Sequence, residues 1–291
     1  MKQGVYKITN NNYHNHFCDE PTLSTGSIKS ILDSPARCWF NHPRLNPAYV
    51  RPEYERKFDL GSAVHDYVLE GGNAIEIIRG FDDWKKKEAR ELAELADSAG
   101  KIPLLQKQFD TVAPIAESVW KTIRNCVELE ITNMQADGDA ELSYIWREGE
   151  TWIRTRPDWI SKDRNLILDV KTTGKSADPD EFSRHIADTG YDIQAALYRR
   201  GVQILEGKTP EFVFIAVEIK EPYLCCPVSL SAEFMELGNQ KVEAGIALWR
   251  HCMKTDNWPG YPKRVCWAEV KPWVIASWES KKFDIERMIN G

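Results

Sequence analysis

Three charged residues in the middle of the chain have the types and spacing to bind a metal ion and to orient a water molecule. Asp158 precedes a short apolar stretch, and Asp169 and Lys171 follow within the β-favouring run 166–173. Charged side chains are rarely buried unless they are paired or coordinate a metal ion. Either these charges lie on a solvated face of a strand, or they form a site.

A β-hairpin would bring the three residues together. If Asp163 and Arg164 form a two-residue loop, Asp158 lies opposite Asp169 on the neighbouring strand. Directly opposed Cβ atoms lie about 5 Å apart, and Lys171 shares the face of Asp169 because alternate residues of a strand point the same way. Asp-Arg is not a preferred turn pair, so the alternative is a longer loop that shifts the pairing by one residue.

Two opposed carboxylates repel each other, and a divalent cation between them would remove the conflict. Mg²⁺ prefers oxygen ligands, so Asp158, Asp169 and the backbone carbonyl of Val170 could bind it together with a phosphate oxygen. Lys171 could then hold and polarise the attacking water. The alternative is an exposed ion pair between Asp169 and Lys171, with Asp158 elsewhere on the same solvated face.

Hydrophobic periodicity predicts the elements that would position these residues. In the first ~135 residues we expect helices over 25–36, 59–72, 82–100 and 104–125. Three consecutive antiparallel strands follow, over 140–147, 151–160 and 165–172. A polar loop then leads into a helix over 192–205, strands over 211–220 and 223–230, and a long helix over 231–254.

This order of elements indicates an α/β fold with a central mixed β-sheet (βββαβ) flanked by helices and preceded by a mainly helical N-terminal region. With 291 residues, of which 42% are hydrophobic, the chain can bury a substantial core. No repeat, low-complexity tract or Gly/Ser linker divides it. We expect a single domain over 1–291, with a helical region over about 1–135 and a catalytic core over about 136–256.

The net charge of -6 argues against a protein that coats nucleic acid through bulk positive charge. A local basic groove is still compatible with it. The candidate DNA-binding residues are Arg37, Arg44, Arg51, Lys85, Lys86 and Lys87. The alternative for each is an ordinary solvated surface charge.

The cysteines and the N-terminus bear on the cellular compartment. Seven cysteines without a C-x-x-C pair favour reduced thiols over a disulfide framework or a zinc site. The first twenty or so residues lack the apolar core of a signal peptide, and no run reaches the ~18 apolar residues of a membrane span. We therefore expect a cytoplasmic protein without a membrane segment.

The sequence "RPDW" followed by "DVKTT" resembles the motif of the PD-(D/E)xK nuclease superfamily, and more closely that of its RecE-type exonucleases (exodeoxyribonuclease VIII). Upstream, Gly61 and His65 are similar to the G-x-x-x-H element of these enzymes. Downstream, Gln194 and Tyr198 are similar to their Q-x-x-x-Y element. The Ser-rich stretch 23–40 also resembles the opening helix of these nucleases, so the resemblance spans roughly residues 20 to 200. The motifs occur in the family's order and lie on the predicted helices and strands.

The resemblance implies a restriction-endonuclease-like core and further site residues. His65 would be a metal ligand, where the alternative is a core histidine. Gln194 would support the active centre, and Tyr198 would contact DNA or pack beneath the site; the alternative is a core-facing pair. Glu141 matches a glutamate common in RecE-like sequences, as a metal ligand or as a charge at a strand end.

The resemblance also implies an activity and partners. RecE-type enzymes use Mg²⁺, for which Mn²⁺ would substitute, to resect linear double-stranded DNA from 5′ ends. They release mononucleotides and leave a 3′ single strand for a RecT-type annealing protein, typically of a phage or prophage. They form homo-oligomeric rings with the duplex in a central channel. In a trimer or tetramer of this kind, only the lining of the channel needs to be positively charged.

Two other activities remain open at this point. One is a PD-(D/E)xK endonuclease or structure-specific nuclease, and the other is a non-catalytic DNA-binding recombination scaffold, which the presence of Asp158, Asp169 and Lys171 disfavours. An iron–sulfur nuclease would need a grouped C-terminal cysteine triad that Cys252 and Cys266 do not supply, so no iron–sulfur cluster is expected.

Overall fold

The computed structural model describes residues 2–9, 12–13, 18, 20–50 and 60–290. The chain divides into two compact units, Met1–Trp258 and Pro259–Gly291. All seven cysteines are free thiols, as the sequence predicts. None of the helices in the described ranges is long and apolar enough to cross a membrane.

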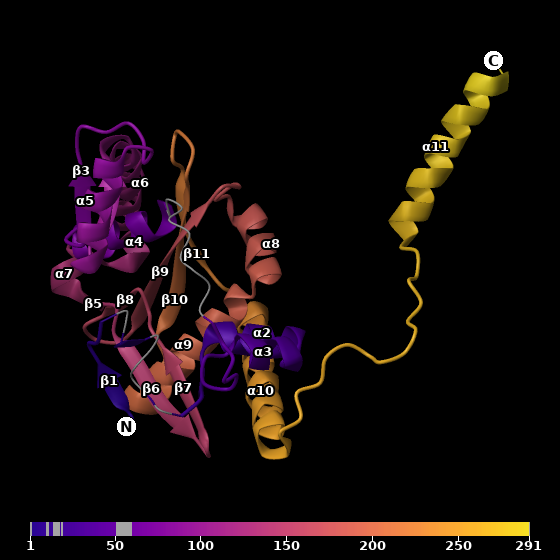
Figure 1. Cartoon of the computed structure of the whole chain (residues 1–291), viewed down its shortest axis with the longest axis horizontal. Coiled ribbons are helices and arrows are strands. Elements are labelled where there is room, and N and C mark those ends of the chain that lie inside the picture. The colour runs from indigo at the N-terminus through magenta and orange to yellow at the C-terminus, as the bar shows by residue number, and fades with distance from the viewer. Residues whose placement is uncertain (1, 10–11, 14–17, 19, 51–59, 291) are drawn as a thin grey trace. The chain divides into compact units, whose positions relative to one another are not determined.

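A five-stranded mixed sheet forms the centre of the first unit (Figure 1). Its strands, in spatial order, are β11 (Cys225–Ser229), β10 (Glu211–Glu218), β9 (Leu166–Thr173), β8 (Trp159–Ser161) and β5 (Gly138–Ala140). The pair β9–β10 is parallel and the other neighbours are antiparallel. The expected α/β fold with a mixed sheet is confirmed.

Two smaller sheets accompany the central one. The first has the order β1 (Gly4–Tyr6), β6 (Ser143–Glu148), β7 (Thr151–Thr155) and β2 (Thr22–Leu23), and the second pairs β3 (Ile75–Ile78) with β4 (Ile102–Leu105). The N-terminal region is thus less purely helical than expected, because β1 to β4 all precede the central sheet in the sequence.

The helices flank these sheets. Among the described residues of the first unit, the helices are α2 (Thr25–Asp33), α3 (Pro35–Asn41), α4 (Leu60–Glu70), α5 (Lys87–Ser98), α6 (Gln106–Asn125), α7 (Met134–Asp137), α8 (Pro179–Thr189), α9 (Tyr191–Glu206) and α10 (Ala232–Thr255), with a 3₁₀ helix at Val127–Leu129. The second unit contains α11 (Pro272–Asn290). The expected loop before 192 is wrong, because α8 fills it, and α11 lies where no element was predicted.

The central sheet is buried on both faces. Side chains on one face pack with α2, α8, α9 and α10, and those on the other pack with α4 and α6. Along β9, Ile167 belongs to the first layer, whereas Leu168 and Val170 belong to the second. Asp169 is two residues on from Ile167, so it points to the face that α9 and α10 cover. It is 0% exposed, which rules out a solvated strand face.

The predicted pairing of the hairpin is confirmed, although its loop is longer than expected. Trp159 pairs with Leu168 and Ile160 with Ile167, the register that places Asp158 opposite Asp169. The loop covers 162–165, and Arg164 within it has a φ of 64°. Because the loop gains one residue on each side, the pairing of the strands beyond it is unchanged.

The expected second strand, 151–160, is wrong as a single element. It divides at Pro157 into β7 and β8, which belong to different sheets. Proline lacks the N–H that a ladder requires, so the strand changes partners there. The three consecutive strands therefore do not lie in one sheet, and Asp158 lies at the start of β8, next to the break.

Helices α9 and α10 approach closely at Gly238. A Cβ atom at this position would lie 2.4 Å from the backbone oxygen of Asp192 in α9. Nearby, Lys241 Nζ lies 2.6 Å from Oδ2 of the fully buried Asp192. This contact fixes α9 against α10.

Glu148 ties β6 to α9. Its two carboxylate oxygens each accept a hydrogen bond of 2.7 Å from Arg200, through Nε and Nη2, and Oε1 also accepts one of 2.9 Å from Trp146 Nε1. Burial alone would raise the pKa of Glu148, but these hydrogen bonds outweigh it and hold the pKa below its usual value.

We expect Glu148→Gln to destabilise the protein at pH 7 by about 2 kcal/mol, since it removes a charge-assisted hydrogen bond from a partly buried pair. A depressed carboxylate pKa stabilises the fold above the unfolded pKa of about 4.3, and that contribution disappears as the pH falls through the folded pKa. The deficit of the variant should therefore shrink towards pH 3, roughly.

Urea unfolding at several pH values measures this difference. The matched control is Glu150→Gln in the adjoining turn, where the side chain is exposed. A deficit for Glu148→Gln that is the same at every pH would show that the hydrogen bonds do not depend on the ionised carboxylate.

Candidate metal centre

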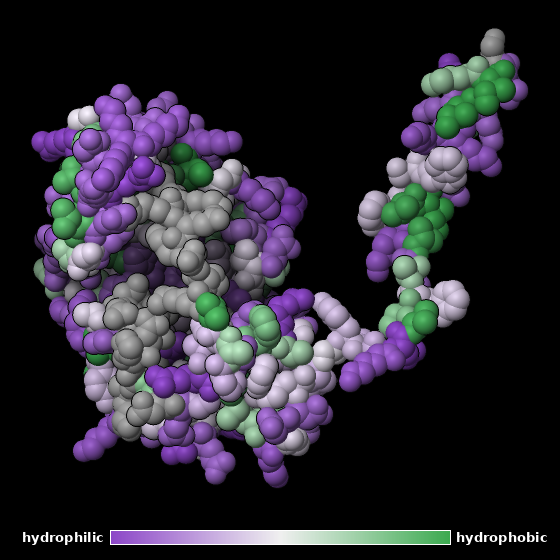
Figure 2. Space-filling model, viewed as in Figure 1, coloured by the Kyte–Doolittle hydropathy of each residue, from purple (hydrophilic) through white to green (hydrophobic). Residues whose placement is uncertain are grey.

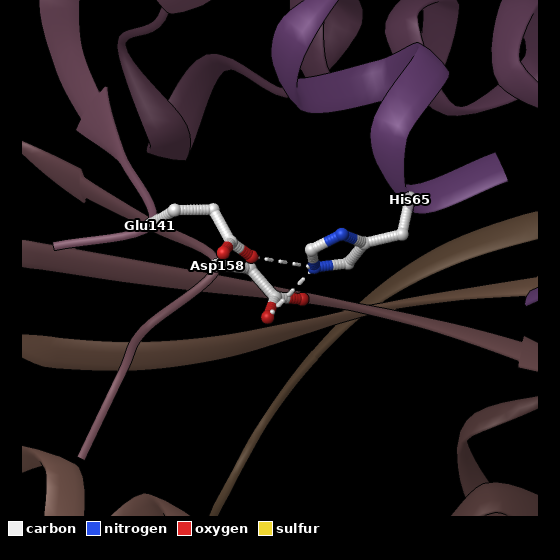
Figure 3. A group of neighbouring side chains, drawn as sticks. All are labelled: His65, Glu141 and Asp158. Carbon is white, nitrogen blue, oxygen red and sulfur yellow. Dashed lines mark ion pairs between the residues drawn. The ribbon is translucent and has the colours of Figure 1, made fainter. Parts of the chain in front are cut away.

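Three side chains from separate parts of the chain meet at one point (Figure 3). His65 comes from α4, Glu141 follows β5, and Asp158 precedes β8. Each offers one ligand atom, and these atoms lie within 4.8 Å of one another. His65 Nε2 lies 2.9 Å from Asp158 Oδ1 and 3.7 Å from Glu141 Oε1. An imidazole and two carboxylates at this spacing could hold a divalent cation.

The packing of α4 aims His65 at this point. Ala63, Val64 and Val68 are buried on the side of the helix that packs in the second core layer, with α6. His65 lies on the adjoining face, where its side chain is 28% exposed. The reading of His65 as a core histidine is therefore not supported by its position.

Hydrogen bonds with the backbone hold the Asp158 carboxylate and the main chain at Glu141 in place. Asp158 Oδ2 accepts a hydrogen bond of 2.8 Å from the N–H of Val170, which leaves Oδ1 turned towards His65. The N–H of Glu141 donates to the backbone oxygen of Asp158 at 2.9 Å. Glu141 has a φ of 59°, a left-handed conformation that costs a residue with a Cβ about 1 kcal/mol. Such local strain is typical of functional sites.

Asp169 and Lys171 form the adjoining part of the network. Oδ1 of the buried Asp169 forms an ion pair with the Lys171 ammonium. Its Oδ2 accepts a hydrogen bond of 2.6 Å from Gln194 Nε2 in α9. The structure therefore brings Asp158, Asp169, Lys171 and Gln194 together, but the ligand atoms of Asp169 lie outside the three-residue cluster.

Electrostatic coupling is strong across these groups. Burial disfavours the charged form of His65, but the attraction and hydrogen bond of Asp158 prevail and raise its pKa to about 9. Burial and the repulsion of Asp158 raise the pKa of Asp169 to about 6, against the opposing effect of Lys171. Burial lowers the pKa of Lys171, but both aspartates outweigh it and keep the ammonium charged. The acidic groups thus create a site that favours a cation.

A cleft of about 810 Å³ opens at this network. His65, Glu141, Val170 and Lys171 line it, and the Val170 carbonyl as a metal ligand stays a prediction. Hard-cation ligands and an ammonium group in one cleft suit the hydrolysis of an anionic ester, in which negative charge develops on oxygen.

Sequence reasoning missed basic and aromatic residues of this cleft. Arg156 forms an ion pair with Glu141, and its Nε and Nη1 atoms have no hydrogen-bond partner among the described residues. The Tyr191 ring lies 4.9 Å from Lys171 Nζ, and Lys7 also lines the cleft. Arg156 could have been found from its place in "RPDW", whereas Tyr191 and Lys7 gave no signal.

Tyr198 packs into the core. Its ring contacts Phe212 at 6.2 Å between centroids, and burial raises its pKa well above the usual value. It is not among the described residues that line the cleft. Of the two expected roles, the structure favours packing beneath the site over contact with DNA.

The described members of the expected DNA-binding set do not line this cleft. Arg37 forms an ion pair with Asp33, and Lys85 and Lys87 lie 3.7 and 3.5 Å from Asp83 and Glu91. These residues, with Arg44 and Lys86, are not among the described cleft residues, and Arg51 lies outside the described residues. The ion pairs of Arg37, Lys85 and Lys87 are typical of a solvated surface, and the DNA contacts of the whole set stay a prediction.

Residues 24–267 match the family model described as "PDDEXK-like domain of unknown function (DUF3799)". No curated protein sequence matches.

Among solved structures, the crystal structure of an Eubacterium rectale protein described as a "Putative exonuclease" matches with a TM-score of 0.57 and 12% identity. The match covers 91% of this chain and 97% of that chain. At this identity, the likeness supports the fold alone. The crystal structure of SSO0001 has a TM-score of 0.27 and 9% identity over 70% of this chain and 98% of that chain, which supports no argument.

We expect His65→Gln to weaken Mn²⁺ binding at least about tenfold, because even residues that only support metal ligands contribute that much. Isothermal titration calorimetry of the purified protein measures the affinity. His251→Gln is the matched control, because His251 is exposed on α10. Unchanged affinity in His65→Gln would place the metal elsewhere.

Proposed function

The chain belongs to the PDDEXK-like domain family, and on this premise we propose that it is a Mg²⁺-dependent nuclease that hydrolyses phosphodiester bonds in double-stranded DNA. The observation that carries the proposal is the cluster of His65, Glu141 and Asp158 next to the Asp169–Lys171 pair, with His65, Glu141 and Lys171 lining one cleft. This arrangement joins hard-cation ligands to a buried ammonium group, which suits phosphodiester hydrolysis because negative charge develops on the phosphate oxygens.

The residues of the cluster fit a hard divalent ion. His65, Glu141 and Asp158 would hold it, and Asp169 and the Val170 carbonyl are the further ligands we propose. A bound Mg²⁺ or Mn²⁺ would supply charge stabilisation on the phosphate oxygens and lower the pKa of a bound water. Protonated His65 would have to lose its proton to become a ligand.

Lys171 is the residue we propose to orient the attacking water. Asp169 holds its ammonium on one side, and the Tyr191 ring lies 4.9 Å from it. Gln194 in turn fixes Asp169 through the 2.6 Å hydrogen bond. Gln194 would therefore act by positioning, without touching the substrate.

Arg156 is suited to hold the phosphate group. It lines the cleft, where its guanidinium charge would attract a phosphate group, and its Nη2 atom forms the ion pair with Glu141. Lys7 also lines the cleft and adds positive charge.

We further propose that the enzyme is an exonuclease that acts from 5′ to 3′ and releases mononucleotides. The support is the motif order in the sequence, and the similar crystal structure described as a "Putative exonuclease" agrees with the fold that this order implies. The single-stranded 3′ tail would serve a RecT-type annealing protein, and the chain would act as a homo-oligomeric ring around the duplex. The alternatives are an endonuclease and a DNA-binding scaffold.

We expect Lys171→Ala and Asp169→Asn each to lower nucleotide release from linear duplex with Mg²⁺ at least about a hundredfold, since each removes preorganised charge from the site. Asp169→Asn keeps the shape of the side chain and an oxygen that can accept from Gln194. Release of acid-soluble nucleotide measures the rate.

Lys175→Ala is the matched control, because this lysine lies in the exposed segment just after β9. Circular dichroism and DNA-end binding should be unchanged in every variant. Substantial activity in both site variants would mean that the chemistry lies elsewhere.

A second assay separates the exonuclease from its alternatives. With duplex labelled at either the 5′ or the 3′ end, we expect labelled mononucleotide to appear first from the 5′ label, and covalently closed circular DNA to stay intact. Cleavage of the circle would indicate an endonuclease. Binding without any hydrolysis would indicate a scaffold.

A further inference from the structure

Helix α11, Pro272–Asn290, exposes many large apolar side chains. None of its residues is buried, and Figure 2 shows hydrophobic residues in green along it. The exposed large apolar residues of the helix are Trp273, Val274, Ile275, Trp278, Phe283, Ile285, Met288 and Ile289. A helix of this kind usually has a partner, because soluble proteins rarely leave such a surface in water.

The apolar residues of α11 follow a heptad repeat. Ile275 and Ile289 occupy a positions, and Trp278 and Ile285 occupy d positions, so the spacings along the chain are three, seven and four residues. Val274 and Met288 widen this seam at the flanking g positions. Repeats of this kind pack against another helix through interlocking side chains.

One position of the seam is polar. Lys282 occupies the central a position, and its Nζ atom lies 3.7 Å from Glu286 Oε1 in the next turn. A lysine at a single a position is a known device of coiled coils, since it lowers stability but fixes the register and the number of helices. Because Glu286 lies at an e position, this ion pair places the Lys282 ammonium group at the edge of the seam and not at its centre.

The flanking charges select the partner and its direction. Lys281 is at a g position and Glu286 is at the following e position. In a parallel pair of identical helices, each g residue faces the next e residue of the other copy, so Lys281 would meet Glu286 of the second copy twice by symmetry. In an antiparallel pair e faces e, which would set the acidic Glu279 and Glu286 against each other.

We propose that α11 is a self-association element, which packs in parallel and in register against α11 of a second copy of this chain. The seam of Ile275, Trp278, Ile285 and Ile289 forms the contact, and Lys281 with Glu286 sets its direction. A parallel, in-register pair of identical helices has two-fold cyclic symmetry, which is the commonest symmetry of homo-oligomers. The contact does not depend on the proposed nuclease activity, and its test needs no substrate.

Disulfide trapping in the full chain tests the contact. In a Cys266→Ser background, which removes the exposed native thiol, Ile285→Cys places a thiol in the seam and Phe283→Cys places one outside it. With diamide as oxidant, we expect the Ile285→Cys protein to form a disulfide-linked dimer at least about tenfold faster, because pairing raises the local thiol concentration.

Non-reducing electrophoresis gives the rates. Trp278→Cys should also link to itself, and should not link to Ile285→Cys when the two proteins are mixed. Equal rates for Ile285→Cys and Phe283→Cys would overturn the contact. Faster linkage between positions 278 and 285 than within either would overturn the parallel register.

A charge exchange tests the direction independently. Lys281→Glu and Glu286→Lys should each weaken self-association of the full chain severalfold, about two- to fivefold for two exposed ion pairs, and the double variant should recover it. Sedimentation equilibrium measures the association, with Arg287→Glu at an outward position as the matched control. A double variant weaker than both single variants would contradict the pairing.

Discussion

Two carboxylates are buried within one network at the junction of β8 and β9, and positive charge must balance both of them. Asp158 takes its counter-charge from His65, and Asp169 takes its own from Lys171. Because a poorly hydrated environment strengthens both repulsion and attraction, the two pairs cannot be separated from each other without an energetic cost. The elements around the site supply these partners: α4 brings the imidazole, β9 the ammonium and α9 the amide of Gln194.

The break in the strand at Pro157 determines where this charge is placed. A continuous strand would have kept Asp158 within a regular ladder, where its backbone alone would pair. At the start of β8, its side chain can instead accept the N–H of Val170, and its backbone oxygen accepts that of Glu141. One residue thus connects the edge strand, the hairpin and the metal-ligand cluster.

The sequence predicted the hairpin and its register because alternation of side chains along a strand is a strong local signal, seen in Ile167, Asp169 and Lys171. It also predicted that Gln194 would support the acidic centre. It did not predict the change of sheet at Pro157, because periodicity reports which residues are extended and not which neighbours they pair with. For the same reason Lys7 was missed: residues far apart in the chain meet in the cleft only through tertiary contacts. The basic segments were selected by composition alone, and composition does not distinguish a binding surface from solvated charge.

The close contact at Gly238 makes the site dependent on a helix that lies outside the cleft. Gln194 is held over Asp169 only while α9 keeps its place against α10, and that distance is set by the missing side chain at Gly238. A methyl group there would touch no ligand, no substrate and no residue of the cleft. It would nevertheless impair the active centre, because displacement of α9 would move the amide of Gln194 away from the carboxylate of Asp169. A position that looks like inert packing thereby becomes part of the functional sequence.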